Sequence, residues 1–322
     1  MVALAPSSLR ILSFNLRYDS QSDSISVEDT LKNLPDPLQP RTSYYQNTGE
    51  RRWSDRRVAV ANEILFNKVE LIGFQEALVR QVKDLQELLG SDWDHVGVGR
   101  DDGFNRGEFS PIFWKKSVLQ LIDWDTFWLS DYPFQAGSKY PGAGSVRICT
   151  VAYFKSAAGE VAVMATHWDD RSDTQRQLGA SLILHRARHE ATKRNVPVIL
   201  LGDFNSPAQG RDSAGYEIIT GVRKPLPISS EFVERYPVSE NGFQMIDLIG
   251  RAPRRFVSGN HATYTGFSEV QNWSNFGRID FIMGGSNERW EVESYRVGQS
   301  LYDDGMYESD HRPVFVDIRV SP

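Results

Sequence analysis

The sequence is poor in cysteine, with Cys149 as the single one in 322 residues. One cysteine excludes an intramolecular disulfide framework and a thiolate metal cluster, and its apolar neighbours predict a buried structural thiol. Long hydrophobic runs are also missing: none approaches the length that crosses a bilayer, and the first nine residues are too short and weakly apolar for a secretory signal. We therefore expect a soluble protein without a transmembrane segment, cytoplasmic unless a leader has been removed.

The chain also lacks an excess of positive charge. It carries 36 Lys and Arg against 42 Asp and Glu, a net charge of -6, which gives no general attraction to nucleic acid or to anionic membranes. A local basic cluster, Arg51, Arg52, Arg56 and Arg57, stands where Ser54 or Asp55 can start a helix. This cluster is either a solvated basic face or a phosphate contact at the junction of loop and helix.

Three catalytic signatures are absent: the Gly-x-Ser-x-Gly nucleophile elbow, the P-loop lysine motif and the His-Glu-x-x-His zinc motif. His185 and His189 stand one turn apart on a predicted helix, a spacing that can hold zinc, but no third ligand lies near them in the sequence. Acyl transfer, P-loop phosphoryl transfer and zinc peptidase chemistry are therefore poorly supported.

Short apolar runs predict strands, and the earlier ones alternate with amphipathic helices in a βαβ rhythm. No internal repeat, low-complexity tract or linker divides the chain, so we expect one domain over residues 1–322. The predicted strands are Leu9–Leu16, Glu70–Phe74, Asp94–Val98, Ser110–Trp114, Val118–Trp128, Arg147–Phe154, Val161–Thr166, Val198–Leu201, Gly277–Met283, Trp290–Val297 and Val314–Val320, with helices at Ala77–Leu89 and Ser172–Thr192.

The segment Gly202-Asp203-Phe204-Asn205 follows an apolar run that reads as a strand buried on both faces. Alternation along an extended chain would put the Asp203 carboxylate and the Asn205 amide on the same side. Such a pair suits a hard cation or a nucleophilic water, because both groups offer oxygen and the amide adds a donor. The ordinary alternative is an Asx turn that closes a strand.

Polar residues stand in the same way at the ends of several other apolar strands. In an α/β fold these ends converge on one edge of the sheet, where sites form. The residues are Asn15, Glu76, His167, Asp203, Asn205, Asp280, Asp310 and His311.

With these motifs the sequence resembles the endonuclease/exonuclease/phosphatase superfamily, whose members include deoxyribonuclease I, exonuclease III and neutral sphingomyelinases. The matching pieces span nearly the whole chain in family order. They are Ser-Phe-Asn at 13–15, Gln-Glu at 75–76, Thr-His at 166–167, Gly-Asp-Phe-Asn at 202–205, Arg-Ile-Asp at 278–280 and Ser-Asp-His at 309–311. The resemblance implies an α/β (α+β) fold, a four-layer α/β/β/α sandwich of two mixed sheets packed face to face with helices outside.

The resemblance also implies roles for these residues. Glu76 would be the principal metal carboxylate, with Asn15 and Asp310 beside it. Hard oxygen ligands without thiolates favour Mg²⁺ or Mn²⁺ over zinc. Asp203 and Asn205 would align the attacking water and hold the scissile phosphate.

His311 would be a general base or a phosphate-neutralising cation, oriented and kept basic by Asp280. Members of the superfamily differ on whether the Asp or the His takes the proton of the water, and the sequence leaves both open. His167, with an acidic partner, resembles the deoxyribonuclease I and sphingomyelinase branches; Glu108 is the candidate partner, or else an exposed loop carboxylate. Arg147 either contacts the phosphate or forms a structural ion pair.

The substrate is less well defined. Trp168 and Trp273 could stack on bases or sugars, or could complete the core. Residues 124–147 resemble an uncharacterised branch of the superfamily, which offers no substrate. We expect a monomeric, metal-dependent hydrolase of phosphate esters, most of all a phosphodiesterase, with nuclease and phosphomonoesterase as variants and a nucleotide or nucleic acid among the candidate substrates. The competing classes are a phosphate-binding scaffold without catalysis and an interaction hub built on the basic cluster.

Overall fold

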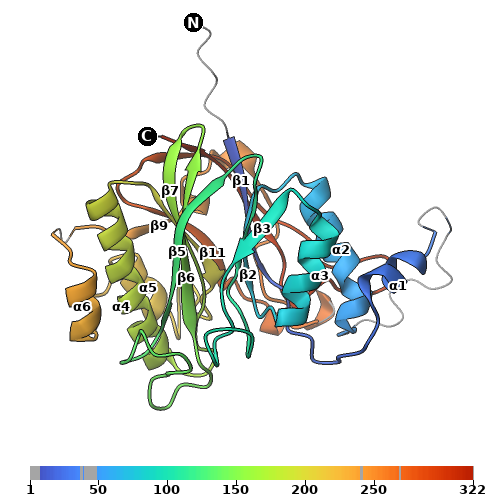
Figure 1. The fold of residues 1–322 in the computed structure, drawn as a ribbon, viewed down its shortest axis with the longest axis horizontal. Coiled ribbons are helices and arrows are strands. Elements are labelled where there is room, and N and C mark those ends of the chain that lie inside the picture. Colours follow the sequence, from blue (N-terminus) through green and yellow to red (C-terminus); the bar gives the residue numbers. More distant parts are fainter. Residues whose placement is uncertain (1–7, 37–38, 40–48, 240–241, 268–269, 322) are drawn as a thin grey trace, which may run out of the picture.

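The computed structural model describes residues 8–36, 39, 49–239, 242–267 and 270–321. Two β-sheets face each other, and helices cover the outer face of each (Figure 1). Helices α2 and α3 pack on one sheet, and α4 and α5 pack on the other. The predicted four-layer α/β/β/α sandwich is therefore confirmed. The helices are α1 Val27–Lys32, α2 Trp53–Phe66, α3 Val79–Leu89, α4 Asp173–His189, α5 Ala214–Ile219 and α6 Ser230–Arg235.

Both sheets are mixed. The first has the order β10-β12-β13-β1-β2-β4-β3, and the second has the order β5-β6-β7-β8-β11-β9. Parallel pairing joins β1 to β2, β7 to β8 and β10 to β12, and the other pairs are antiparallel. The strands are β1 Ser8–Asn15, β2 Leu71–Gln75, β3 Trp93–Val96, β4 Ile112–Lys115, β5 Gln120–Trp128, β6 Ile148–Ser156, β7 Gly159–His167, β8 Val198–Asp203, β9 Met245–Asp247, β10 Val257–Gly259, β11 Asp280–Gly285, β12 Trp290–Val297 and β13 Val314–Val320.

Strand β8 is buried on both faces, as its unbroken apolar run predicts. Ile199 and Leu201 join the core between the two sheets, whereas Val198 and Leu200 join the core beneath α4. Successive side chains point to opposite faces of a strand, so an amphipathic pattern here would leave one of these cores unfilled. The central strands thus give a rigid base for the side chains at their ends.

The sheets approach closely at Gly73 in β2. A Cβ built on Gly73 would lie 2.9 Å from Leu201 Cδ1 and 3.0 Å from Leu201 Cβ, on the facing sheet. We expect Gly73→Val to lower the free energy of unfolding by about 1–3 kcal/mol, because added methyl groups must push the sheets apart. Urea denaturation measures this. Gly250→Val is the control, since a Cβ there meets no atom within 4 Å, and equal losses in both variants would contradict the close approach.

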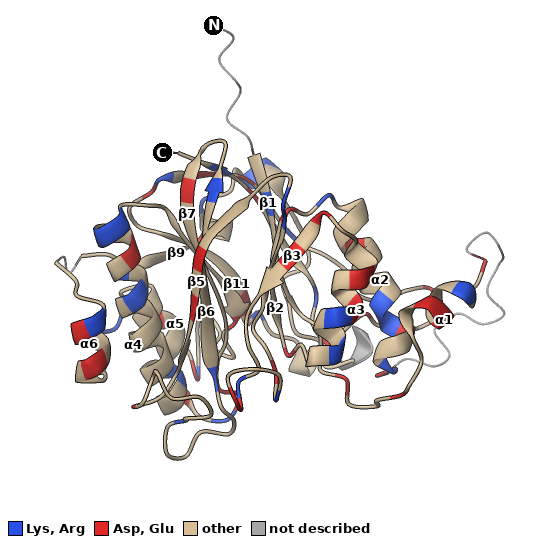
Figure 2. Ribbon diagram, viewed as in Figure 1, with Lys and Arg blue, Asp and Glu red and all other residues tan. Residues whose placement is uncertain are grey.

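Two of the four arginines in the basic cluster at the start of α2 depart from both expectations for it, whereas Arg52 is exposed. The side chains of Arg56 and Arg57 are fully buried. Arg57 pairs with Asp84 at 2.8 Å, and Arg56 donates to backbone carbonyls. They form neither a solvated face nor a phosphate contact. Along the labelled outer helices, acidic and basic residues are interspersed (Figure 2).

Among the described residues, no helix combines the length and the apolar character needed to span a membrane.

Candidate active site

The polar strand ends meet at one edge of the sandwich, as predicted. Asn15 closes β1 and lies opposite Gln75, whose neighbour is Glu76. On the second sheet, Asp203 lies between His167 of β7 and Asp280 of β11 in the strand register. Because β1 and β2 contact β8 across the sandwich, these two groups face one another.

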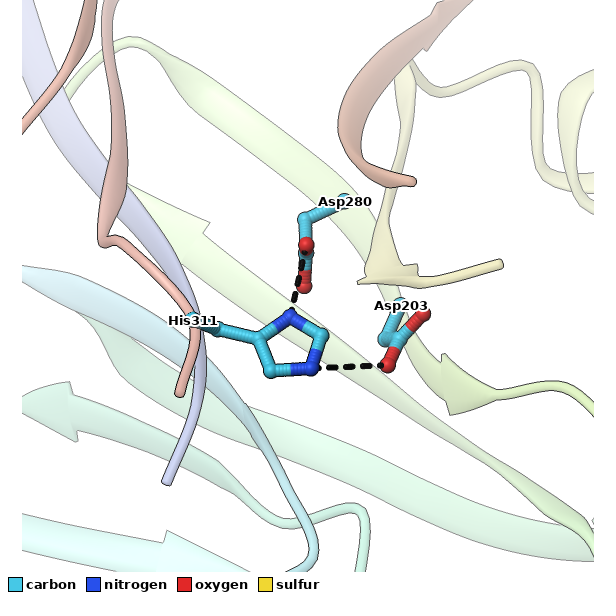
Figure 3. A group of neighbouring side chains, drawn as sticks. All are labelled: Asp203, Asp280 and His311. Carbon is cyan, nitrogen blue, oxygen red and sulfur yellow. Dashed lines mark hydrogen bonds and ion pairs between the residues drawn. The ribbon is translucent and has the colours of Figure 1, made fainter. Parts of the chain in front are cut away.

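His311 lies between two buried carboxylates (Figure 3). Its Nδ1 is 2.8 Å from Asp280 Oδ2, a hydrogen bond, and its Nε2 is 3.6 Å from Asp203 Oδ2. Burial lowers the pKa of His311, but the charges of Asp280 and Asp203 outweigh it and raise that pKa well above its usual value. The imidazole is therefore a cation held between the two acids.

Asp203 lies at the centre of the site, in contact with Asn15, His167 and His311. Burial, and then the charge of Asp280, raise the pKa of its carboxyl to about 7, against the opposing effect of His311. Asn15 Nδ2 donates to Asp203 Oδ2 at 3.0 Å and to Glu76 Oε1 at 3.1 Å, so it links the two sheets. A carboxyl group with a pKa near neutrality can exchange protons with water at physiological pH.

The side chains of Asp203 and Asn205 lie close together because of a turn, and not because of strand alternation as expected. The Asn205 backbone N–H donates to Asp203 Oδ1 at 2.9 Å, the hydrogen bond of an Asx turn, and the φ of Asn205 is +47°. The chain thus leaves the strand at Asn205, and alternation along an extended segment does not bring the two side chains together. The ordinary alternative, an Asx turn, is present, and it places the Asn205 amide at the site.

Glu76 also has a left-handed backbone, with φ of +60°. Non-glycine residues seldom adopt this conformation, and such strain is concentrated at functional positions. Its carboxylate accepts the Tyr18 backbone N–H at 3.1 Å as well as Asn15 Nδ2. The turn after β2 therefore aims Glu76 towards the end of β1.

His167 is less simply paired than expected. Its Nε2 contacts Asn205 Nδ2 at 3.1 Å, and its Nδ1 is 3.8 Å from Glu108 Oε2, too far for a hydrogen bond. Glu108 is instead held by Arg100, whose Nη1 donates to Oε2 at 2.6 Å. Burial, then Arg147 and Arg100, hold the pKa of His167 well below its usual value. This imidazole is neutral and does not add positive charge to the site.

Arg147 does form an ion pair, between its Nη2 and Asp170 Oδ1 at 2.8 Å. Its Nε and Nη1 are buried and have no hydrogen-bond partner among the described residues. The structural ion pair with Asp170 therefore gives a partner to Nη2 of the Arg147 guanidinium only.

The two tryptophans lie in different surroundings. Trp168 is fully buried and stacks on Phe204, with ring centroids 4.1 Å apart and planes at 11°. It completes the core, so the prediction that it stacks on a substrate is wrong. Trp273 lies in the 3-10 helix η4, Val270–Asn275, with 71% of its surface exposed, and stays a candidate for substrate contact.

The structure adds neighbours that the sequence analysis missed. Tyr264 packs its ring against His311 at 5.0 Å between centroids, and Thr263 Oγ1 accepts the Asp280 backbone N–H at 3.0 Å. Arg100 holds Glu108. These residues belong to no motif that stands out in the sequence, and only the fold brings them to the strand ends.

Arg56 fastens the two chain segments that carry the first-sheet residues. Its guanidinium donates to the carbonyls of Leu16 and Arg17 just after Asn15, and to that of Glu308 just before Asp310. Burial lowers the pKa of Arg56 to about 10. These buried hydrogen bonds thus hold the segment after Asn15 against the segment before Asp310.

Loss of the Arg56 hydrogen bonds should destabilise the folded protein. We expect Arg56→Met to lower the free energy of unfolding by at least about 1–3 kcal/mol, the cost of one buried polar group left without its partner. Urea denaturation tests this against Arg52→Met, an exposed arginine of the same cluster, which should change stability little. Equal stability of the two variants would contradict a structural role for Arg56.

Three acidic or histidine groups have the spacing of a possible metal site. Ligand atoms of Asp203, Asp280 and His311 all lie within 4.8 Å of one another. Glu76 and Asp310 are the other acids at this edge. Burial raises the pKa of Asp310, and the negative charge of Glu76 raises it further. The positive charges of His311 and Arg17 oppose this rise. The edge therefore holds enough clustered oxygen donors to bind a divalent cation.

Comparisons with known proteins agree with this geometry. A sequence model described as the Endonuclease/Exonuclease/phosphatase family matches residues 12–311. No curated protein matches the sequence. A solved endonuclease/exonuclease/phosphatase from Bacteroides vulgatus is 28% identical, with a TM-score of 0.74 over 98% of this chain and 100% of its own.

Two further solved structures share the fold at lower identity. The mannosyl-6-phosphatase of Bacteroides thetaiotaomicron is 24% identical, with a TM-score of 0.69 over 96% of this chain and 99% of its own. The D. rerio TDP2 in complex with a single-strand DNA product is 15% identical, with a TM-score of 0.61 over 97% and 99%. With a family match over nearly the whole chain and the fold in agreement, this protein belongs to the endonuclease/exonuclease/phosphatase family.

Proposed function

We propose that the protein hydrolyses phosphate esters with the help of Mg²⁺ or Mn²⁺, and that phosphodiesters are its preferred substrates. The observation that carries the proposal is the position of His311 between Asp280 and Asp203, at the edge where Glu76 and Asp310 also lie. Positive charge for a phosphoryl group and a proton acceptor for water thus lie side by side.

Each residue has a role in an in-line attack by water. Asp203, with a pKa of about 7, can take the proton of the attacking water, while Asn15 Nδ2 and the Asn205 backbone N–H hold its carboxylate in place. His311 is already protonated, so in this scheme it neutralises a phosphoryl oxygen rather than acting as the base. Asp280 holds its ring in place through Nδ1. A bound cation would stabilise negative charge on the phosphoryl and leaving oxygens.

Glu76 and Asp310 are the residues that we propose hold this cation. They are carboxylates whose mutual repulsion a cation would relieve, and hard oxygen donors suit Mg²⁺ and Mn²⁺. Asn15 lies beside them but turns its amide NH₂ towards Glu76, while its oxygen accepts the Arg17 N–H at 2.9 Å. Asn15 would therefore orient Glu76. The Asp203, Asp280 and His311 group suits a cation less, because a protonated imidazole has no free lone pair.

On the substrate side, exposed Trp273 offers an aromatic face, and Arg147 stays a candidate phosphate contact although its Nε and Nη1 are buried. Proteins with this fold include one named for a sugar phosphate substrate and one solved with a single-strand DNA product. A sugar phosphate, a nucleotide or a nucleic acid are therefore the substrate classes to test first, and phosphomonoester hydrolysis is the variant to measure beside diester hydrolysis.

Hydrolysis of a generic aryl phosphodiester should be compared with that of the matching monoester, each with Mg²⁺, with Mn²⁺ and with excess chelator. We expect turnover of the diester that the chelator abolishes. A preference for the monoester would make the protein a phosphatase. Ligand binding without turnover of either ester, or of nucleotides and sugar phosphates, would favour a non-catalytic scaffold and contradict the proposal.

A further inference from the structure

A small cavity beside His167 is lined by residues that carry buried polar atoms without partners. Among the described residues, four buried nitrogens of this lining make no hydrogen bond: Arg100 Nε, Arg147 Nε, Arg147 Nη1 and His167 Nδ1. Glu108 lines the same cavity, with Oε2 at 3.8 Å from His167 Nδ1. Buried polar groups in folded proteins nearly always have a partner, which can be an ordered water. Four unpartnered buried nitrogens among the residues of one cavity indicate that a molecule occupies it.

The hydrogen bonds of Asn205 fix the proton on His167. Asn205 Nδ2 is 3.1 Å from the Trp168 carbonyl oxygen, which can only accept, so the amide NH₂ must face this way. The same NH₂ is 3.1 Å from His167 Nε2, closer than Asp203 Oδ2 at 3.4 Å, so we assign Nε2 as the acceptor of its second proton. In a neutral imidazole the remaining proton lies on Nδ1. The Nδ1–H thus points at the cavity, where Glu108 is too far away to accept it.

We propose that this cavity holds one internal water molecule, which accepts the His167 Nδ1–H and donates to Glu108. The lining requires an occupant that both accepts and donates, because it includes arginine and imidazole N–H groups as well as the Glu108 carboxylate. An anion would satisfy the donors but would lie against Glu108. The cavity volume of about 10 Å³ is close to the least that holds a single water.

This water gives His167 a role different from that of a charged phosphate ligand. With its proton kept on Nδ1, the ring offers Nε2 as an acceptor to Asn205 and so holds the amide beside Asp203. His167 is thus a positioning residue for Asn205. The water site itself does not depend on the proposed phosphoesterase activity, so it can be tested on the folded protein alone.

NMR spectroscopy shows directly which ring nitrogen of His167 carries the proton. Long-range ¹H–¹⁵N NMR spectra of the ¹⁵N-labelled protein distinguish a protonated ring nitrogen from an unprotonated one, and the signals lost in His167→Gln assign the residue. We expect protonated Nδ1 and unprotonated Nε2 in the wild type near neutral pH. In Asn205→Asp the donor becomes an acceptor, so Nε2 should gain a proton. An Nε2–H tautomer or an imidazolium in the wild type, or an unprotonated Nε2 in Asn205→Asp, would overturn the assignment.

A crystal structure at atomic resolution tests the occupant. We expect one water within about 2.7–3.2 Å of His167 Nδ1 and Arg147 Nη1, and within hydrogen-bond reach of Glu108. Crystals soaked in bromide distinguish an anion by its anomalous signal. Bromide in the cavity, an empty cavity, or a direct Glu108–His167 hydrogen bond would each overturn the proposal.

Discussion

Replacement of His311 by alanine is expected to lower the turnover of the best phosphate ester by about 10²- to 10⁴-fold, the usual cost of losing a charged catalytic group that acts in the transition state. The ring contributes a buried positive charge between Asp280 and Asp203 that no neighbouring group replaces in the variant. We expect the fold to persist, because the ring hydrogen-bonds to the Asp280 side chain and not to the backbone.

Initial rates at saturating and limiting substrate measure the loss, and circular dichroism measures the fold. His189→Ala is the matched control, since His189 lies at the far end of α4 and contacts the Pro237 carbonyl. It should retain full activity. A folded His311→Ala protein with activity near that of the wild type would remove His311 from the mechanism.

Asp203→Asn is the second change expected to have a large effect. The variant keeps an oxygen to accept the Asn205 N–H, but it loses the group that takes the proton of the water. We expect a loss of about 10²- to 10⁴-fold in kcat with little change in KM, as for removal of a general base.

Stability separates this effect from simple damage. The pKa of Asp203 is raised to about 7, so ionisation of this carboxyl is disfavoured in the folded state and weakens the fold as the pH rises from its unfolded value near 4 through 7. An asparagine has no such ionisation, but its NH₂ would face the Asn15 Nδ2 donor in place of Oδ2, so we expect at most a moderate fall in the urea midpoint at pH 8. Asp317→Asn is the contrasting control: it breaks the Asp317 pair with Arg10 at 2.6 Å, far from the site, and should cost stability without loss of activity. A destabilised but active Asp203→Asn protein would contradict the assignment.

Much of the fold could be predicted because the central strands are unusually clear in the sequence. The ranges Trp290–Val297 and Val314–Val320 coincide with β12 and β13, and the other predicted strands shift by a few residues. Apolar runs that end in single polar residues predict that these residues share one edge. The strand register, which the pattern does not specify, puts Asp203 between His167 and Asp280.

The failures arise where tertiary contacts decide a side chain's surroundings. A run of arginines predicts a solvated face, yet Arg56 and Arg57 are buried because carbonyls and Asp84 happen to surround them. Trp168 next to a site residue reads as a binding aromatic, but Phe204 covers it. The pairing of Glu108 with Arg100 rather than with His167 depends on a loop geometry that no local pattern encodes.

The most direct test of a cation held at Glu76 is a titration of metal-stripped protein with Mn²⁺ or Mg²⁺, with hydrolysis of the best phosphate ester as the readout. Wild-type protein, Glu76→Gln and the control Glu87→Gln, an exposed position on α3, are compared. We predict that the cation restores activity saturably in the wild type and in Glu87→Gln, and that Glu76→Gln needs far more cation or stays inactive. Activity that survives the chelator, or equal rescue of all three proteins, would contradict a cation held at Glu76.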